Sequence, residues 1–171
     1  MVINRCQSNT YFLKKLKIKL INVNRTRDTW ISDGVNDYKG RLERYVVFED
    51  VVVKPGKHSS QERRRVLQEE AAKILTLIKK DDHLVLLDDT GQSMDSIQFS
   101  SWINKKNISL QGDLVFVIGG AYGFDEQIVK AADEKVSLSR MTFTHQMVRL
   151  IFMEQLYRAF TILRNEPYHH G

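Results

Sequence analysis

The stretch DLVFVIGGAYG, residues 113–123, joins a short apolar run to a glycine-rich turn. A continuous apolar run of this length is typical of a strand that is buried on both faces of a parallel sheet. Gly119, Gly120 and Gly123 have no Cβ atom, so the backbone after the strand can adopt a positive φ and approach a ligand closely. The stretch therefore predicts a central parallel strand whose carboxyl end opens into a candidate binding loop.

Predicted strands and helices alternate on both sides of this stretch. Strands are predicted over 17–24, 46–53, 83–88, 113–120 and 135–139, and helices over 29–44, 61–80, 96–106, 125–133 and 145–164. We predict a turn over 88–91 and take Ser60 as a candidate N-cap of the second helix. The alternation is typical of an α/β fold in which helices flank a mostly parallel sheet. We expect one domain over 17–171, preceded by a disordered extension, residues 1–16.

The composition is that of an ordinary globular protein. The 171 residues suffice for one domain with a core. No apolar run approaches the roughly 20 residues that a membrane span needs, and no signal peptide is visible. Cys6 is the single cysteine and cannot form an internal disulfide, which fits a reducing cytosol. We therefore expect a cytoplasmic protein with neither a membrane nor DNA as its partner.

Positive charge is unevenly distributed along the chain. Residues 1–19 hold five basic residues and no acidic one, so the remaining residues balance at 21 of each sign. Residues 54–80 contain eight basic residues against three acidic ones, with Arg63, Arg64 and Arg65 at their centre. This run fits an RNA contact or the solvated face of a helix, and the sequence leaves both open.

Three loops follow predicted strands, over 87–91, 118–123 and 138–143. Because the carboxyl ends of parallel strands meet at one edge of a sheet, we expect these loops to line one pocket. Taken alone, GGAYG also fits a tight turn between a strand and a helix. It matches neither the dinucleotide fingerprint nor the P-loop. The pattern favours a nucleoside-type ligand that is held by backbone groups rather than by its phosphates.

The last predicted helix carries charged residues in pairs. His145 and Arg149 are four residues apart and share a face, as do Glu154 and Arg158, which also fit an ordinary surface ion pair. The residues between them are mostly apolar, which suggests a subunit interface. The sequence has neither Cys ligands nor H-E-x-x-H spacing to accompany its histidines, so we expect no metal site.

Together these segments resemble one enzyme family. Leu87-Asp88, IGGAYG, SLSRMTFTHQMVR, EQLYRAFTI and the terminal PYHH are similar to the SPOUT-class methyltransferases that methylate N3 of a pseudouridine in large-subunit ribosomal RNA. The resemblance covers roughly residues 17–171. It implies a C-terminal trefoil knot, S-adenosylmethionine as cofactor, a homodimer, and the assembled ribosome as substrate.

The resemblance also implies site residues. By position, the cofactor contacts are Leu87, Gly119, Leu138, Ser139, Arg140, Met141, Thr142 and Phe143. Residue chemistry and the resemblance together give as catalytic candidates His145, Arg149, Tyr157, Arg158, Tyr168 and His169. We expect the arginines to anchor phosphate or base, His145 to accept or orient a proton, and the tyrosines and His169 to stack on the substrate or handle a proton.

The chain departs from the family at Ala121-Tyr122, where Pro-Glu is common, and at Thr144, where Pro is common. The glycines remain, so we expect cofactor binding to be retained. Two alternatives stay open: a SPOUT methyltransferase that acts on transfer RNA, and a ribosome-binding module that has lost methyl transfer. The intact glycine turn and the serine- and arginine-bearing run after it argue against the second.

Overall fold

A computed structural model describes residues 15–56 and 62–168. In these residues strands and helices alternate in the order β1 (Lys17–Val23), α1 (Thr29–Leu42), β2 (Val47–Val53), α2 (Arg63–Leu75), β3 (His83–Ser93), α3 (Ser96–Ser109), β4 (Leu114–Ile118), α4 (Glu126–Ala131), β5 (Glu134–Ser137) and α5 (His145–Leu163). The order of the elements agrees with the sequence prediction.

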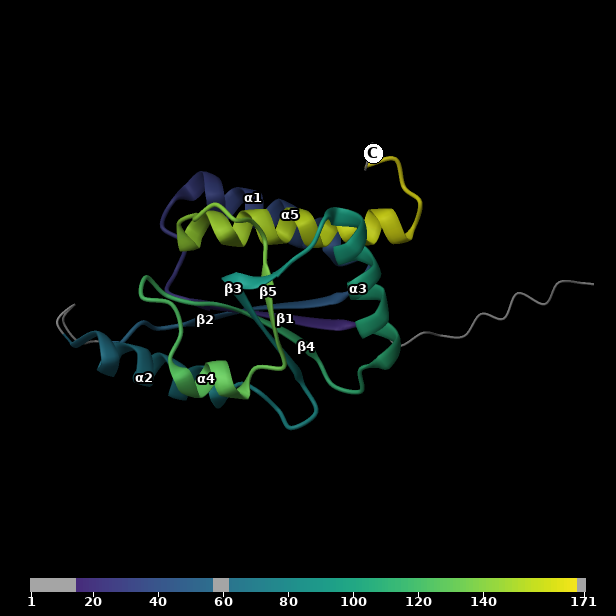
Figure 1. The fold of residues 1–171 in the computed structure, drawn as a ribbon. Coiled ribbons are helices and arrows are strands. Elements are labelled where there is room, and N and C mark those ends of the chain that lie inside the picture. The colour runs from purple at the N-terminus through teal and green to yellow at the C-terminus, as the bar shows by residue number, and fades with distance from the viewer. Residues whose placement is uncertain (1–14, 57–61, 169–171) are drawn as a thin grey trace, which may run out of the picture.

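The strands form one parallel sheet in the order β2-β1-β4-β3-β5. Figure 1 shows α1 and α5 over one face of the sheet and α2 and α4 over the other. Side chains alternate across the central strand: Leu114 and Phe116 pack in the core cluster under α1, α3 and α5, and Val115 and Val117 pack in the cluster with α2 and α4. This confirms the predicted α/β fold. The strand order does not specify how the chain threads, so the trefoil knot stays a prediction.

The predicted turn over 88–91 is wrong, because β3 continues through it to Ser93. The register against β5 shifts within this segment, so that Leu87 and Gln92 both pair with Val136. At Gly91 a Cβ atom would lie 2.6 Å from the backbone of Lys135 and Val136, so only glycine permits this close pairing. The polar residues that suggested a turn instead form an irregular extension of β3 along the sheet edge.

The helix predicted over 61–80 is shorter in the structure. It begins at Arg63, with Glu62 at the N-cap position, and ends at Leu75. After it, Leu77 and Ile78 donate backbone hydrogen bonds three residues back and pack against the core, so the apolar periodicity continues beyond the helix. Ser60, the predicted N-cap, lies outside the described residues.

Leu16, which the sequence analysis placed in the extension, packs with the fold. Leu16 is buried and its carbonyl accepts a hydrogen bond from the backbone N–H of Val47. The packed fold therefore includes the residue before β1. Residues 1–14 of the expected extension lie outside the described residues.

A polar cluster around Glu134 joins α3 to the first residues of β3 and β5. The Glu134 carboxylate accepts hydrogen bonds from Trp102 Nε1 at 2.9 Å and from Lys106 Nζ, and it lies 2.8 Å from His83 Nε2. Burial alone raises the pKa of Glu134, but the hydrogen bonds from Lys106, Trp102 and His83 outweigh it, so that the pKa lies below its ordinary value. The carboxylate is therefore stabilised in its charged form.

We expect Glu134→Gln to lower the free energy of unfolding by about 2 kcal/mol at neutral pH, because charge-assisted hydrogen bonds are lost. Since folding lowers the pKa of Glu134, its contribution is present above the ordinary value of 4.5 and is lost as the pH falls through the folded value. The difference between wild type and variant in urea unfolding should therefore shrink below about pH 4. Glu126→Gln is the control, since its pair with Lys130 is solvent-exposed. Equal effects of both substitutions would contradict this account.

Candidate functional site

A cavity of about 350 Å³ opens at the carboxyl ends of β4 and β5, beside the middle of β3. The three loops that the sequence predicted to share one pocket all line it, together with the first turns of α5. Every predicted cofactor residue except Arg140 belongs to its wall. Arg140 lies in the same loop with an exposed side chain and is not part of the lining.

The turn after β4 forms one wall of this first cavity largely from backbone. The N–H of Gly123 donates to the carbonyl of Gly120 at 3.2 Å, and Gly123 has a φ of 80°. A Cβ atom on Gly119 would lie 2.9 Å from the Gly123 carbonyl oxygen. Glycine is therefore required at both ends of the turn, and a bound molecule can approach the main chain there.

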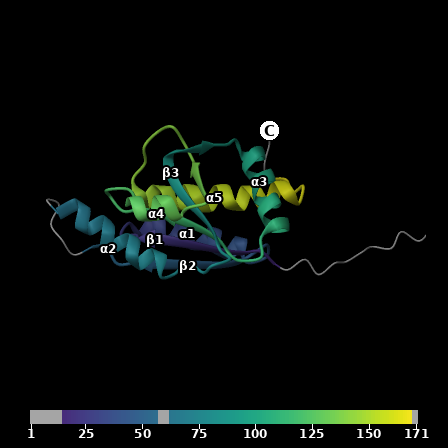
Figure 2. The same ribbon diagram turned by 60° about the horizontal axis from the view of Figure 1, so that its bottom comes forward.

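The loop 138–144 forms the opposite wall and leads into α5, as the turned view in Figure 2 shows. The Met141 N–H donates to Ser139 Oγ at 2.9 Å, and the Ser137 hydroxyl donates to the Ser139 carbonyl at 2.9 Å. Thr144 is the N-cap of α5, and its hydroxyl accepts from the Met147 N–H at 3.3 Å. The residue that departs from the family pattern therefore has a helix-capping role in this chain.

The first cavity carries negative charge on one side and an imidazole on the other. Burial raises the pKa of Asp88, but hydrogen bonds from the Thr90 hydroxyl and N–H outweigh it, so that the pKa lies below its ordinary value. Burial lowers the pKa of His145, and the charges of Arg149 and Arg27 lower it further. At neutral pH the cavity therefore combines an ionised carboxylate, suited to a cationic ligand, with an uncharged imidazole able to accept a proton.

Arg149 lies beneath the site rather than on its surface. Its side chain is 2% exposed and donates to the Val23 carbonyl at 2.9 Å, the Asn24 carbonyl at 2.5 Å and the Thr26 hydroxyl at 2.6 Å. Asn24 has a positive φ of 70°, so the guanidinium holds the strained end of β1 against α5. This arrangement supports a positioning role for Arg149 and not the phosphate contact that we expected.

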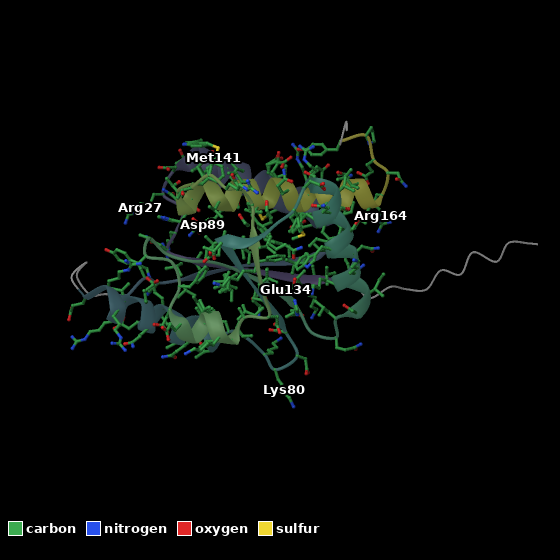
Figure 3. The ribbon with its side chains drawn as sticks, in the orientation of Figure 1. Arg27, Lys80, Asp89, Glu134, Met141 and Arg164 are labelled. Carbon is green, nitrogen blue, oxygen red and sulfur yellow. The ribbon has the colours of Figure 1, made fainter. Side chains whose placement is uncertain are left out.

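The remaining catalytic candidates lie at the other end of α5. Arg158 lies thirteen positions after His145, which corresponds to roughly 20 Å along a helix. In Figure 3, Met141 and Asp89 lie near the first turn of α5, whereas Arg164 lies beyond its last turn. A single chain therefore does not bring Tyr157, Arg158 and Tyr168 to the first cavity. His169 lies outside the described residues.

At that far end these side chains bond to one another. Arg158 Nη2 donates to Glu154 Oε1 at 2.5 Å and its guanidinium lies 4.9 Å from the centroid of the Tyr168 ring. The Tyr168 hydroxyl donates to Glu154 Oε1 at 3.2 Å and lies 3.2 Å from the Tyr38 hydroxyl. Burial and these contacts raise the pKa of Tyr168. In this arrangement the Tyr168 phenol is a hydrogen-bond donor and not a proton acceptor.

The apolar surface of α5 is largely covered by the chain itself. No residue of α5 is fully exposed, because α1, α3 and the sheet all pack against it. The Ser100 hydroxyl of α3 donates to the Ala159 carbonyl, and the Tyr38 ring of α1 packs on Tyr157. The composition of α5 is therefore explained without a partner, and the homodimer stays a prediction.

Some residues of the first cavity were missed by sequence reasoning. Phe124 and Val148 line it, but apolar residues at strand or helix spacing predict the core equally well. For these two residues the local sequence carries no signal that would have identified them. Ile118 and Ala121 also line the cavity, as members of the loop 118–123 that the sequence predicted there.

Residues 16–169 match the family model described as "Predicted SPOUT methyltransferase". The chain belongs to the SPOUT methyltransferase family. A relative from Parabacteroides distasonis is 48% identical over 158 residues, covering 91% of this chain and 99% of that protein. Relatives from Flavobacterium johnsoniae and Trichlorobacter lovleyi are 47% and 44% identical, each covering 91% of this chain and 99% or more of the relative. All three are named ribosomal RNA large subunit methyltransferase H.

Within residues 15–56 and 62–168, no helix has the length and apolar character needed to cross a membrane. In the same residues, no three His, Cys, Asp or Glu side chains gather as metal ligands do.

We expect Arg149→Met to lower the free energy of unfolding by about 3 kcal/mol, because two buried carbonyls lose their donors. Arg149→Lys should recover only part of this loss, since one ammonium group cannot span all three acceptors. Arg164→Met, an exposed substitution just after α5, is the matched control. Chemical denaturation of the three variants measures the effect. A loss no larger than that of Arg164→Met would show that Arg149 does not hold β1 to α5.

Proposed function

We propose that this chain uses S-adenosylmethionine to methylate N3 of a pseudouridine in large-subunit ribosomal RNA, on the assembled ribosome. The observation that carries the proposal is the backbone-walled cavity at the turn after β4 in a chain of the SPOUT family. The names of the relatives support the RNA substrate. Since ribosomes reside in the cytoplasm, the enzyme would act there.

The first cavity fits S-adenosylmethionine in size and chemistry. Its volume of about 350 Å³ lies within the usual range of small-molecule sites. Leu87, Ile118 and Leu138 offer apolar contacts for a purine ring, and the turn after β4 offers backbone groups for its polar edge. Asp88 and Asp89 place negative charge beside a cationic ligand. The residues present therefore suit a positively charged nucleoside.

The role proposed for His145 follows from its position and charge. When bound, S-adenosylmethionine supplies an activated methyl group. The imidazole of His145 accepts the N3 proton of the base. It is available as an acceptor because its lowered pKa keeps the imidazole unprotonated at neutral pH. N3 then forms a bond to the methyl carbon as the carbon–sulfur bond breaks and its electron pair stays on sulfur. The chain's own contribution is alignment and proton transfer.

We further propose that the protein acts as a homodimer. About 20 Å of helix separates the first cavity from Arg158 and its neighbours Tyr157 and Tyr168. These three residues therefore cannot contact a molecule in the first cavity of their own chain. In a dimer with the α5 helices antiparallel, these residues of one subunit would approach the first cavity of the other. There they would stack on the RNA and contact its phosphates, as the sequence predicted.

Labelled S-adenosylmethionine tests the function directly. The protein is incubated with whole ribosomes, isolated subunits, free ribosomal RNA and transfer RNA, and the label is then mapped. We expect label on one pseudouridine of the large-subunit RNA, and only when whole ribosomes are present. Label on transfer RNA alone would support the transfer RNA alternative. No label on any substrate, with the protein bound to ribosomes, would support the binding module.

Complementation tests the shared site. We expect His145→Ala and Tyr168→Ala each to reduce activity strongly when both subunits of the dimer carry the same substitution. If each site combines His145 of one subunit with Tyr168 of the other, random mixing leaves about one quarter of the sites intact. Mixing after unfolding and refolding should therefore restore about a quarter of the wild-type rate. If mixed dimers form and no activity is recovered, either both residues act in the site of the same subunit, or one of them does not belong to the site.

A further inference from the structure

A second cavity lies beside the first and is not explained by the cofactor. Its volume is about 140 Å³, and it opens between the ends of β1 and β2 and the turn after β4. Gly120, Ala121 and His145 belong to the walls of both cavities. A molecule in the second cavity therefore lies directly next to one in the first.

The topology of the sheet favours ligand sites on both sides of β4. After β1 and β3 the chain passes to α1 and α3 on one face, whereas after β4 it passes to α4 on the other. Where neighbouring connections leave a parallel sheet in opposite directions, a crevice opens at the carboxyl ends of the strands. The first cavity occupies the crevice between β4 and β3, and the second that between β4 and β1.

A buried carboxyl group forms one wall of the second cavity. Glu70 of α2 is 5% exposed, and its Oε1 accepts a hydrogen bond from the Gly56 N–H at 3.2 Å. Its Oε2 lies beside Gly120, where a Cβ atom would be only 3.1 Å away. Burial raises the pKa of Glu70 and the charge of Glu69 adds to this, against the Gly56 hydrogen bond and the charge of Lys73, which lower it. The net result is a pKa above the ordinary value of Glu, and a carboxyl that holds its proton can donate a hydrogen bond.

An aromatic residue forms another part of the wall. Tyr122, at the tip of the turn after β4, lines the second cavity. Arg63 of α2 holds this turn: its Nη2 donates to the Tyr122 carbonyl at 3.0 Å, and its guanidinium lies 5.6 Å from the centroid of the ring. At about 30 Å³ for each water, the cavity has room for four or five waters, which is the bulk of one planar base and not of a nucleotide.

We propose that the second cavity receives the acceptor base, a uracil-type ring turned out of the RNA, with its face against Tyr122 and one ring carbonyl hydrogen-bonded to the Glu70 carboxyl. The proposal rests on the function proposed above. Enzymes that modify a base in structured nucleic acid extrude that base into a pocket, and aromatic side chains stack on extruded RNA bases. Tyr122 and Glu70 provide the stacking surface and the polar contact.

The Glu70 contact would assist the loss of the N3 proton, which is difficult because the imide of the base is a weak acid. When N3 loses its proton to His145, negative charge spreads onto the two ring carbonyl oxygens. A hydrogen bond from the protonated Glu70 to one of them stabilises that charge, as donors do in an oxyanion hole. N3 then bonds to the methyl carbon, the carbon–sulfur bond breaks, and the proton remains on His145. Glu70 itself gains and loses no proton.

Substitutions at Glu70 test this role with ribosomes as substrate. Glu70→Leu removes the donor and should lower kcat about 100-fold, whereas Glu70→Gln keeps an N–H donor and should retain most of the rate. Affinity for S-adenosylmethionine, measured by calorimetry, should change less than about twofold in both, because the donor faces the other cavity. Glu69→Gln, the same substitution one residue earlier in α2, is the matched control and should behave as wild type.

The outcomes separate this proposal from the proposed function. If the wild-type protein methylates no ribosome, the proposed function itself is refuted. With an active wild type, an unchanged rate in Glu70→Leu, or a rate in Glu70→Gln as low as in Glu70→Leu, would overturn the role of the protonated carboxyl. So would a loss of cofactor affinity that matches the loss of rate.

A second variant covers the case in which Glu70→Leu does not fold. Tyr122→Leu changes only the tip of a surface turn and should raise KM for ribosomes about tenfold, since stacking on one base contributes about 1–3 kcal/mol. Its affinity for S-adenosylmethionine should stay at the wild-type value. An unchanged KM would show that the base does not stack on Tyr122 and would overturn the proposal.

Discussion

The central strand β4 is buried along its whole length, and the placement of the candidate site depends on it. Its neighbours are held in register so that Asn22 of β1 and Leu87 of β3 both lie opposite Ile118, the last residue of β4. β1 therefore ends within one residue of this level, whereas β3 continues past it to Ser93. The turn at Gly119 follows at once, with the end of β1 on one side and the extension of β3 on the other. Hydrophobic burial of five residues thus fixes the position of a polar site that contains none of their side chains except Ile118.

The helix α5 carries this arrangement across the molecule. Arg149 and Gln146 join its first turns to the ends of β1 and to the start of α1: Gln146 Oε1 accepts from the Arg27 N–H at 2.5 Å and from the Asp28 N–H at 3.2 Å. At the other end, the Tyr157 ring packs against the rings of Tyr38 in α1 and of Tyr45, which follows α1. The helix is anchored at both ends and separates His145 from the tyrosine and arginine cluster. For a catalytic group assembled from both ends, a second chain is the simplest source of the missing half.

The sequence predicted the fold where periodicity and turn residues agree. The apolar run before Gly119 and the alternation of strand and helix patterns identified the parallel sheet, because burial on both faces leaves a distinct pattern. The segment 88–91 was misjudged, since its polar residues favour a turn locally and only the pairing with β5 makes it a strand. Tertiary contacts with β5 override a local preference there.

Side-chain roles were harder to predict than backbone ones. Glu70 looked like one more charged residue of an amphipathic helix, and only the structure shows that it is buried against the turn after β4. Arg149 was assigned to the substrate because arginine beside a pocket is typical of a phosphate contact, yet its partners are carbonyls of β1. Burial of a polar side chain depends on which elements pack over it, and one sequence does not contain that information.

We propose that the turn after β4 and the loop before α5 together bind S-adenosylmethionine. Titration of S-adenosylmethionine into isotopically labelled protein, followed by backbone amide resonances, tests this binding site directly. We expect saturable shifts concentrated in residues 119–123 and 138–143, with no comparable shifts in α2 or at the far end of α5. Saturable shifts confined to other parts of the molecule, or none at all, would contradict it.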